Sequence, residues 1–504
     1  MSYVFLSIAL VIVALVLLYL HNHYSYWARR GIPQEDPIYG LGNMKGIGRE
    51  FHFRDINSRL YERFKRSASP LGGIYMFFMR SAFIVDLDII KHILIKDFSS
   101  FHDRGIFSNV RDEPLTGHLL RLEGEQWRAM RNKLTPVFTS GKMKFMFPTV
   151  VAVAENLSRA CGEFRTEFEV RELTARYTTD VIGTCAFGIE CNSLSDPNAE
   201  FRNYGRLIFG KPRHSQLVQA LILFNPELAR KLRCKVFNDE VTEFFINAVR
   251  STVEYRVQNK VKRNDFMDML IEMMAEDQEA AAQHDSIDLS QGLTLLQMAA
   301  QAFVFFIAGF HTSSTTMSFC LYELAMNQDI QDKLREEILR VLSAHNNIVT
   351  YEAVNEMTYL EQVLSETLRK YTVLPHLLRT ASSDYRIPNT SLTLPKGSKI
   401  LIPVDAIHHD PEIFPEPDIF DPARFDPDIA EKRHACAYMP FGDGPRNCIG
   451  LRFGKMQAKV GLIHLLRDYK FIPSTRTENP IVLSKRNFVI EAENGIYLKA
   501  VRVR

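Results

Sequence analysis

The chain has 504 residues, and its 61 lysine and arginine residues nearly balance its 59 aspartate and glutamate residues. This balance gives no indication of a nucleic-acid partner, and the 46% of hydrophobic residues supplies ample material for a large core. The 7 cysteines are an odd number and include no Cys-x-x-Cys pair. Such cysteine usage argues against a secreted disulfide framework and favours a reducing compartment.

An apolar segment at the N-terminus is the first feature along the chain. Residues 3–20 are strongly apolar and are interrupted only by Ser7. As an α-helix this segment would be about 27 Å long, close to the ~30 Å hydrocarbon core of a bilayer. A cleaved signal peptide is the alternative, but no basic region precedes the segment and its apolar run is too long. We therefore predict a membrane-spanning anchor.

The residues after this segment indicate how the chain continues. Arg29 and Arg30 follow the apolar run, and the positive-inside rule then places the rest of the chain in the cytoplasm. We expect three parts, which are a membrane anchor at residues 1–22, a proline-containing linker at residues 23–40 and one large domain at residues 41–504.

A second apolar run lies in the middle of the chain. Residues 295–310 are broken only by Gln297 and Gln301, and a polar run follows directly. The run is shorter than the ~18 clean apolar residues of a membrane span. A helix that is apolar on all sides is typical of the centre of a large domain, so we predict the central buried helix here. The charged residues 276–288 predict a solvated loop.

Strand patterns gather in two regions. Residues 74–78 and 82–85 have the composition of strands, and near the C-terminus Asn494-Gly495 separates residues 488–492 from residues 496–501. Because Asn-Gly favours a two-residue turn, the second pattern predicts a hairpin. Most of the remaining chain has helical periodicity, which predicts a mainly α fold with a smaller β-rich subdomain.

One of these helical segments carries a charged pair. Apolar side chains between residues 363 and 371 repeat at three- and four-residue spacing, as an amphipathic helix requires. Glu366 and Arg369 lie outside this apolar stripe. From the pattern alone they are an exposed ion pair that contributes less than ~1 kcal/mol to stability.

The segment Phe441-Gly-Asp-Gly-Pro-Arg-Asn-Cys-Ile-Gly450 carries the strongest chemical signal. Arg446 and the helix start that follows Cys448 would both favour the thiolate, which is the form of cysteine that ligates metals. The alternative is that Cys448 is a small buried hydrophobic residue, as most free cysteines are. Motifs elsewhere in the chain decide between the two interpretations.

Four further motifs accompany this segment. In chain order they are Trp127-Arg-Ala-Met-Arg131, Ala308-Gly-Phe-His-Thr312, Glu366-Thr-Leu-Arg369 and Pro422-Ala-Arg-Phe425. Together with Phe-x-x-Gly-x-Arg-x-Cys-x-Gly they resemble the cytochrome P450 family, from the anchor to the last strands. The segments at residues 103–105 and 133–144 look most like insect microsomal members of the detoxification type. The resemblance implies the cytochrome P450 fold, preceded by a single N-terminal transmembrane helix.

The resemblance also implies roles for individual residues. Cys448 would be the axial ligand of haem iron, and Glu366, Arg369 and Arg424 would form a buried structural cluster. The expected haem contacts are Trp127, Arg131, Arg379, Phe441 and Arg446. Arginine suits the haem propionates because its planar fork binds carboxylates in a bidentate manner.

The Ala308–Thr312 motif implies the oxygen-binding face of the central helix. Ala308 and Gly309 would let this helix approach the iron, and Gly309 would keep a side chain out of the oxygen pocket. Thr312 can donate to the Ala308 carbonyl, an arrangement that bends helices. His311 replaces the acid that is usual in the family, and because histidine titrates near neutrality it can relay protons. We expect a working relay with poorer coupling.

The resemblance implies an NADPH- and O₂-dependent haem-thiolate monooxygenase of lipophilic small molecules. Xenobiotics such as plant toxins or insecticides are the first candidates, and endogenous hormones or lipids are the alternative. Six apolar residues fall where substrate would bind, although each could equally be plain core. They are Phe107, Phe303, Val304, Val373, Leu377 and Phe488.

Cofactor, partners and location follow from the same resemblance. The cofactor would be haem b, iron-protoporphyrin IX, and electrons would come from NADPH through a separate NADPH–cytochrome P450 reductase, with cytochrome b5 as a second donor. The protein would sit in the endoplasmic reticulum membrane as a single-pass protein with a cytosolic catalytic domain. Two alternatives are a family member that rearranges peroxides and a haem sensor without turnover. The retained Thr312 argues against the first.

Overall fold

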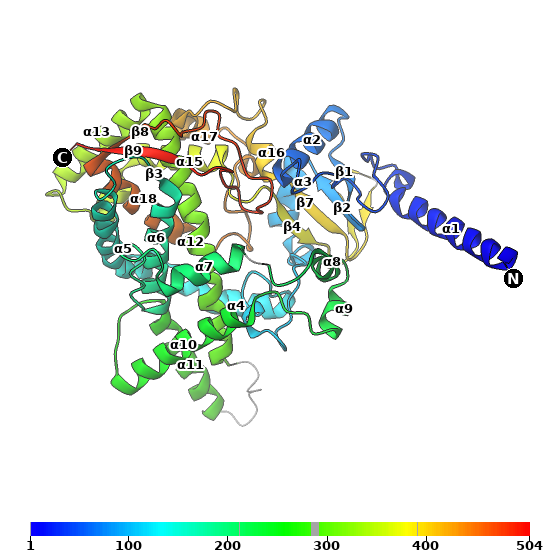
Figure 1. Ribbon diagram of the computed structural model, residues 1–504, viewed down its shortest axis with the longest axis horizontal. Helices are drawn as coiled ribbons and strands as arrows, with labels where there is room; N and C mark the ends of the chain where they lie inside the picture. The colour runs from blue at the N-terminus through cyan, green and yellow to red at the C-terminus, as the bar shows by residue number, and fades with distance from the viewer. Residues whose placement is uncertain (1, 211, 284–291, 391, 504) are drawn as a thin grey trace.

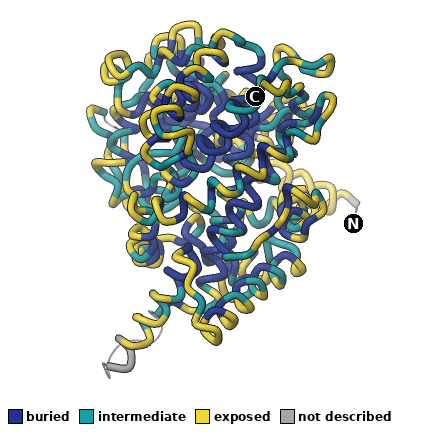
Figure 2. Tube along the Cα trace, turned by 90° about the vertical axis from the view of Figure 1, so that its left-hand side faces the viewer, coloured by how far each residue is buried: buried dark blue, intermediate teal, exposed yellow. Residues whose placement is uncertain are grey.

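The computed structural model describes residues 2–210, 212–283, 292–390 and 392–503. A helical region and a sheet-rich region lie side by side (Figure 1), and each has its own cluster of buried apolar residues. Buried residues run through the middle of the body, and exposed residues cover its outer turns (Figure 2). This is the mainly α architecture with a smaller β-rich part that the sequence predicts.

The helices account for most of the described chain. They are α1 (Ser2–Tyr24), α2 (Phe53–Arg66), α3 (Leu87–Lys91), α4 (Gly124–Leu134), α5 (Ser140–Cys161), α6 (Val170–Ile182), α7 (Glu200–Gly210), α8 (Gln216–Phe224), α9 (Pro226–Lys231), α10 (Asp239–Asn259), α11 (Phe266–Gln283), α12 (Leu295–Met326), α13 (Gln328–Ala344), α14 (Tyr351–Glu356), α15 (Thr358–Lys370), α16 (Val404–His408), α17 (Pro427–Ala430) and α18 (Leu451–Asp468).

The strands form small sheets. They are β1 (Leu71–Met76), β2 (Met79–Ile84), β3 (Phe168–Glu169), β4 (Leu377–Thr380), β5 (Tyr385–Arg386), β6 (Thr393–Leu394), β7 (Lys399–Ile402), β8 (Tyr469–Pro473) and β9 (Tyr497–Arg502). The largest sheet has the order β1-β2-β7-β4, in which β2 and β7 are parallel and the other neighbours are antiparallel. The strands predicted at residues 74–78 and 82–85 are confirmed as β1 and β2, with shifted ends.

The hairpin predicted around Asn494-Gly495 is wrong in its first half. Residues 496–501 largely coincide with β9, but residues 488–492 form no strand, and β9 pairs with β8 and β3. Residues 483–492 instead fold back on themselves through a bridge between Leu483 and Ala492. The residues after the turn pair with strands that are distant in sequence and not with residues 488–492, because the fit of strands to their neighbours decides pairing more than local propensity does.

The helix α12 confirms the predicted central buried helix and extends it to Met326. It starts at a capping box in which Thr294 accepts from the Gln297 backbone N–H and the Gln297 side chain accepts from the Thr294 N–H. Along its length it packs against α6, α10, α15 and α18. The helix α12 therefore lies at the centre of the helical region.

The loop predicted at residues 276–288 is wrong for its first part. Residues up to Gln283 continue α11, and residues 284–291 lie outside the described part of the chain. The sequence between Phe266 and Gln283 is rich in Met, Ala, Glu and Gln. These are strong helix formers, so charge alone was a poor guide to a loop here.

The helix α1 extends away from the body at the sheet-rich end (Figure 1). Its apolar side chains are largely exposed, and residues Tyr3–Tyr24 have the length and hydropathy of a membrane span. The chain after α1 is firmly attached. Trp27 is buried against Gly73, where a Cβ would lie 2.0 Å from the indole, and its Nε1 donates to the Ile74 carbonyl.

Candidate functional site

The loop that carries Cys448 folds tightly before α18. The Cys448 N–H donates to the Phe441 carbonyl at 2.9 Å, which closes the loop. Gly444 has φ of +71°, and a Cβ at this position would lie 1.8 Å from the Leu94 carbonyl oxygen. Only glycine fits such a close backbone contact in a left-handed conformation. The glycine of the motif thus holds the cysteine loop against the segment His92–Lys96.

Cys448 differs from the other cysteines of the chain. Five are buried and Cys234 is partly buried, whereas Cys448 is exposed. Protein atoms nevertheless surround its sulfur, and this desolvation raises the pKa of the thiol, while the Gly450 N–H, Arg104 and Arg131 act to lower it. A thiol that is both desolvated by protein and reachable by solvent fits a sulfur facing an internal space.

Four arginine side chains gather beside this loop. Burial, followed by the positive charge of Arg446, lowers the pKa of Arg379 to about 10. Burial also lowers the pKa of Arg446 to about 10. The pKa of Arg104 is held well below its usual range by burial and by Arg446 and Arg379. Such shifts mean that these cations lack sufficient negative charge around them.

Two of these arginines hold the loop itself. Arg131 donates through both terminal nitrogens to Asn447, at 3.0 Å to its carbonyl and at 2.9 Å to its side-chain oxygen. Arg104 donates to the Arg446 carbonyl at 3.0 Å. Both arginines therefore fix the backbone on the N-terminal side of Cys448.

The other two arginines keep unused donors. The Nε atoms of Arg379 and Arg446 are buried and have no hydrogen-bond partner among the described residues. Arg446 lies over the Trp127 ring at 4.6 Å, and Asp103, at 3.5 Å, is the carboxylate with which it forms an ion pair. Buried cations with unfilled donors indicate a place for an anion, since an uncompensated buried charge is costly.

The middle of α12 packs against α18, the helix that follows the cysteine loop, and part of it is exposed. Ala308 is exposed and Thr312 is half-buried, although the residues of α12 on either side are mostly buried. The Thr312 hydroxyl donates to the Ala308 carbonyl at 2.6 Å, as the sequence predicts. Residues 308 and 312 are one turn apart, so they share a face, and its exposure indicates an internal space beside the helix.

Gly309 lies where α6 packs closely on α12. A Cβ at this position would lie 2.4 Å from the Ile182 side chain of α6. The Gly309 carbonyl accepts from the Gln457 side chain of α18 at 2.9 Å. Glycine therefore favours the close packing of α6 on α12, and its expected part in the oxygen pocket stays a prediction.

Comparison with known proteins identifies this arrangement. A model of the family described as Cytochrome P450 matches residues 32–499.

The chain belongs to the cytochrome P450 family. Its relatives include probable cytochrome P450 6a14 of Drosophila melanogaster, which is 58% identical over 507 residues and covered to 99% in both chains. Probable cytochrome P450 6a13 of the same species is 54% identical over 480 residues, with 95% of both chains covered. Cytochrome P450 6a2, also of Drosophila melanogaster, is 45% identical over 502 residues, covering 98% of this chain and 99% of the relative. The protein is thus a cytochrome P450 monooxygenase of the insect 6a group.

Membership of this family implies a haem-thiolate cofactor, and the residues present fit one. The exposed Cys448 thiol offers an axial ligand, and the unfilled donors of Arg379 and Arg446 suit the two propionates of haem. Ala308 has a small, exposed side chain, which leaves room beside α12. Thiol, cations and small helix residues are thus three independent features that match one cofactor.

The cluster of Glu366, Arg369 and Arg424 is buried, in contrast to the exposed pair that the helical pattern indicates. Arg369 donates to the Glu366 carboxylate from Nε at 2.7 Å and from Nη2 at 2.8 Å, and neither side chain is exposed. Arg424 approaches Glu366 at 3.4 Å, and the Asp421 N–H donates to the same carboxylate at 3.0 Å. Burial raises the pKa of Glu366, and Arg369 and Arg424 oppose this shift.

His408 connects this cluster to the cysteine loop. Its carbonyl accepts from Arg369 at 3.0 Å, and its Nε2 accepts from the Met439 N–H at 2.9 Å. Its Nδ1 lies 2.9 Å from the Thr372 hydroxyl and is therefore the protonated nitrogen. Burial lowers the pKa of His408 to about 3, so the folded chain holds the neutral ring.

The six residues considered for substrate contact are placed differently. Phe488 is 47% exposed, and Leu377 is partly exposed and lies near Gly442 of the cysteine loop. Phe107, Val304 and Val373 are nearly buried. Phe303 is fully buried and packs against Phe237 and Phe245, with ring centroids 4.8 and 5.0 Å away. Its surroundings favour a packing role.

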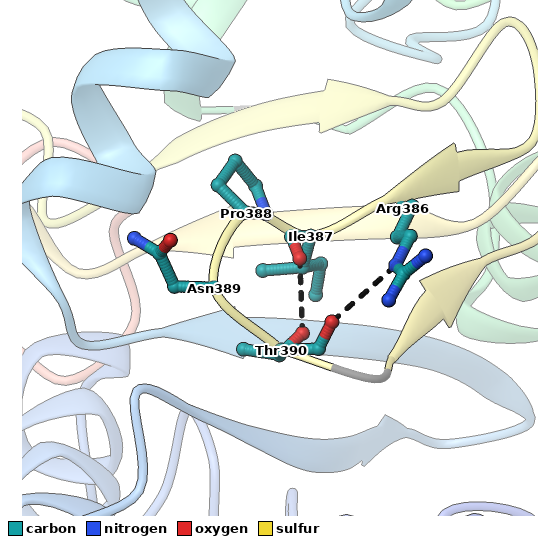
Figure 3. A pocket seen from close by; sticks show the side chains of 5 residues that line it. All are labelled: Arg386, Ile387, Pro388, Asn389 and Thr390. Atoms are coloured by element: carbon teal, nitrogen blue, oxygen red, sulfur yellow. Dashed lines mark hydrogen bonds between the residues drawn. The ribbon is translucent and has the colours of Figure 1, made fainter.

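A surface depression of about 510 Å³ lies away from these residues (Figure 3). It is formed by Arg386–Thr390, in the turn between β5 and β6. Figure 3 shows how the turn closes on itself, through bonds from Thr390 to the Ile387 carbonyl and from Arg386 to the Thr390 carbonyl. It shares no residue with the Cys448 site, and we assign it no part in the chemistry.

Sequence reasoning missed several residues of the site. Arg104 lies in a segment singled out for its likeness to insect enzymes, and nothing in its spacing marks it as a neighbour of Arg446. Asn447, which Arg131 holds, occupies a variable position of the cysteine motif. Glu491 binds His311 and has no motif around it at all. Only the folded chain brings these residues into contact.

Replacement of Glu366 by alanine should lower the unfolding free energy by about 3–5 kcal/mol, because it leaves the buried Arg369 uncompensated. Urea unfolding and the haem absorbance of the purified protein would measure the effect. Glu356→Ala is the matched control, since the Glu356 side chain is 58% exposed in its contact with His345. Equal stability of the two variants would contradict the structural role of Glu366.

Acid should destabilise the protein through His408. Its pKa is lower in the folded chain than its ordinary value of 6.5, so unfolding takes up a proton between pH 6.5 and about 3. The unfolding free energy should therefore fall by about 1.4 kcal/mol per pH unit on going down through this range. Urea midpoints measured from pH 7.5 to pH 5 would check this, and His408→Gln should show a smaller slope. An unchanged slope in that variant would refute the assignment.

Proposed function

We propose that this cytochrome P450 uses haem b bound through Cys448 to oxidise lipophilic small molecules, and that xenobiotics such as plant toxins or insecticides are its main substrates. One observation carries the proposal. The Cys448 thiol is reachable by solvent beside a group of desolvated arginines, and the helix that follows it packs against α12 next to the exposed Ala308. Endogenous hormones or lipids are the alternative substrate class.

The cofactor would be held by residues of both regions. Cys448 would ligate the iron, Arg379 and Arg446 would bind the propionates, and Trp127 would support Arg446 through its ring. Phe441 would fix the cysteine loop through its carbonyl. When bound, haem supplies the activation of molecular oxygen, which a thiolate ligand favours by donating electron density to the iron.

The chain's own residues would handle protons and water near α12. The Thr312 hydroxyl donates a hydrogen bond to the Ala308 carbonyl, which is also the helical acceptor at this turn. The hydroxyl oxygen then remains an acceptor for a water molecule in the site. His311 precedes Thr312 in α12, and its buried ring lies 2.7 Å from Glu491, so a proton relay through His311 would pass by way of Glu491.

The substrate wall would be apolar. Phe488 and Leu377 reach it with partly exposed side chains, and Val304 and Val373 border it. Phe107 lies 5.8 Å from the Arg230 guanidinium of α9, which places it under the α8–α9 segment. Apolar and aromatic side chains of this kind exclude water and favour lipophilic ligands.

The membrane and the electron donor would contact different parts of the protein, α1 and the surface near Cys448. The exposed apolar surface of α1 supports a single-pass anchor in the endoplasmic reticulum, with Arg29 and Arg30 on the cytosolic side. NADPH–cytochrome P450 reductase, with cytochrome b5 as a second donor, would dock near Cys448. Arg452 in the first turn of α18 and Arg128 of α4 are exposed there and would steer an acidic partner.

Cys448→Ser should abolish the strongly red-shifted band of the reduced carbon monoxide complex, because only a thiolate ligand produces it. The measurement is a difference spectrum of the full-length protein in membranes. Cys436→Ser is the matched control, since Cys436 is buried and its pKa is raised by desolvation to about 11. A red-shifted band that survives in Cys448→Ser would defeat the assignment of the ligand.

A screen of ligand-induced spectral shifts should separate the substrate classes. We expect plant toxins and insecticides to give larger shifts at low concentration than hormones and fatty acids do. Compounds that bind should then be turned over only when reductase and NADPH are both added. A panel in which hormones or fatty acids alone bind and turn over would favour the endogenous alternative.

A further inference from the structure

A three-residue cluster lies on the side of α12 next to Thr312. His311 Nε2 lies 2.7 Å from Glu491 Oε1 and 2.8 Å from Arg171 Nη2, and the Arg171–Glu491 distance is 2.5 Å. His311 belongs to α12, Arg171 to α6, and Glu491 to the segment before β9. The His311 ring is also covered by Phe209 of α7, with the two rings stacked at 4.4 Å.

The cluster holds one net ion pair and one neutral ring. Burial lowers the pKa of His311, and although burial acts to raise the pKa of Glu491, His311 and Arg171 bring it below its usual range. Glu491 is then a carboxylate that accepts from both neighbours. With Nε2 donating to Glu491, His311 Nδ1 is unprotonated, and this buried atom has no partner among the described residues.

The second oxygen of Glu491 binds its own loop. Oε2 accepts from Asn487 Nδ2 at 2.7 Å, and the Asn487 carbonyl is held by His52 at 2.7 Å. The Ser484 N–H donates to the Glu491 carbonyl at 2.7 Å, which closes the base of the loop. One carboxylate therefore connects the tip of the loop to its base and to two helices.

Phe488 stands at the tip of this loop. It is 47% exposed, and its ring meets those of Phe53 and His376 with centroids 6.2 and 5.5 Å away. The loop also borders the segment between α15 and β4, since the Ile490 N–H donates to the Val373 carbonyl at 3.3 Å. The loop thus reaches from the cluster around His311 to the proposed substrate wall.

We propose that Glu491 is a positioning residue that fixes the Phe488 loop against α12 and α6 and so sets the substrate wall beside Thr312. The inference rests on the proposed function, because it takes Phe488 to contact substrate. A loop that is held in place needs no ordering when ligand binds. If only a fraction of the molecules has the loop in the binding-competent position, the apparent affinity is reduced in proportion to that fraction.

The test is equilibrium binding to the full-length, haem-loaded protein, which is measured through the spectral shift that each ligand causes. The probes are a bulky lipophilic ligand from the screen and imidazole, which needs only the iron. Glu491→Gln should weaken the bulky ligand about tenfold, since it removes the charge from three hydrogen bonds, and should leave imidazole within twofold. Glu491→Asp should restore part of the loss. The control is Glu493→Gln, because Glu493 is exposed on the same segment.

A double-mutant cycle with Phe488→Ala shows whether Glu491 acts through the loop. If it does, Glu491→Gln should have little further effect on the bulky ligand once the Phe488 ring is gone. Additive effects, or equal weakening of the bulky ligand and imidazole, would overturn the proposal. A wild-type protein that fails to bind either probe would instead count against the proposed function itself.

Discussion

The desolvation of positive charge beside Cys448 is the constraint on which the rest of the site depends. Arg379 and Arg446 are buried with donors that no described residue fills, and Asp103 alone gives Arg446 a carboxylate partner. A folded chain does not tolerate such charge without an anion nearby. Haem carries two carboxylates, and under the proposed function Arg379 and Arg446 would bind them while Cys448 would hold the iron. We infer that folding of this region and loading of haem are linked, because a ligand that binds only the folded chain stabilises it.

The same constraint explains why the cysteine loop is so rigidly built. A thiolate directed at iron must keep its position whether or not the arginines are compensated. At Gly444 the loop lies so close to the Leu94 carbonyl that a side chain would clash with it. Arg131 donates to Asn447, and His408 accepts from the Met439 N–H. None of these contacts touches the sulfur. They fix the backbone that leads into Cys448, which is how a scaffold positions a reactive group precisely.

The sequence predicted the parts of the fold that are local and failed where distant partners decide. The bond that closes the cysteine loop, from the Cys448 N–H to the Phe441 carbonyl, and the Thr312–Ala308 bond each join residues fewer than ten positions apart. Glu366 appears exposed in its helical pattern because its partner Arg424 and the Asp421 N–H lie more than fifty positions later. The predicted terminal hairpin failed for the same reason.

The helix α12 uses three faces within one turn, and this sets how ligand and chemistry communicate. Ala308 and Thr312 face the site, Gly309 admits α6, and His311 meets Glu491. In the family an acid usually occupies the position of His311. Such an acid would be attached to the helix and would move only with the helix. Here the carboxylate sits on the C-terminal loop, so any ligand that displaces this loop must also strain its bond to His311. If Phe488 contacts substrate as proposed, substrate fit and the arrangement of polar groups beside Thr312 would be coupled through one carboxylate, whereas an acid on the helix would leave them independent.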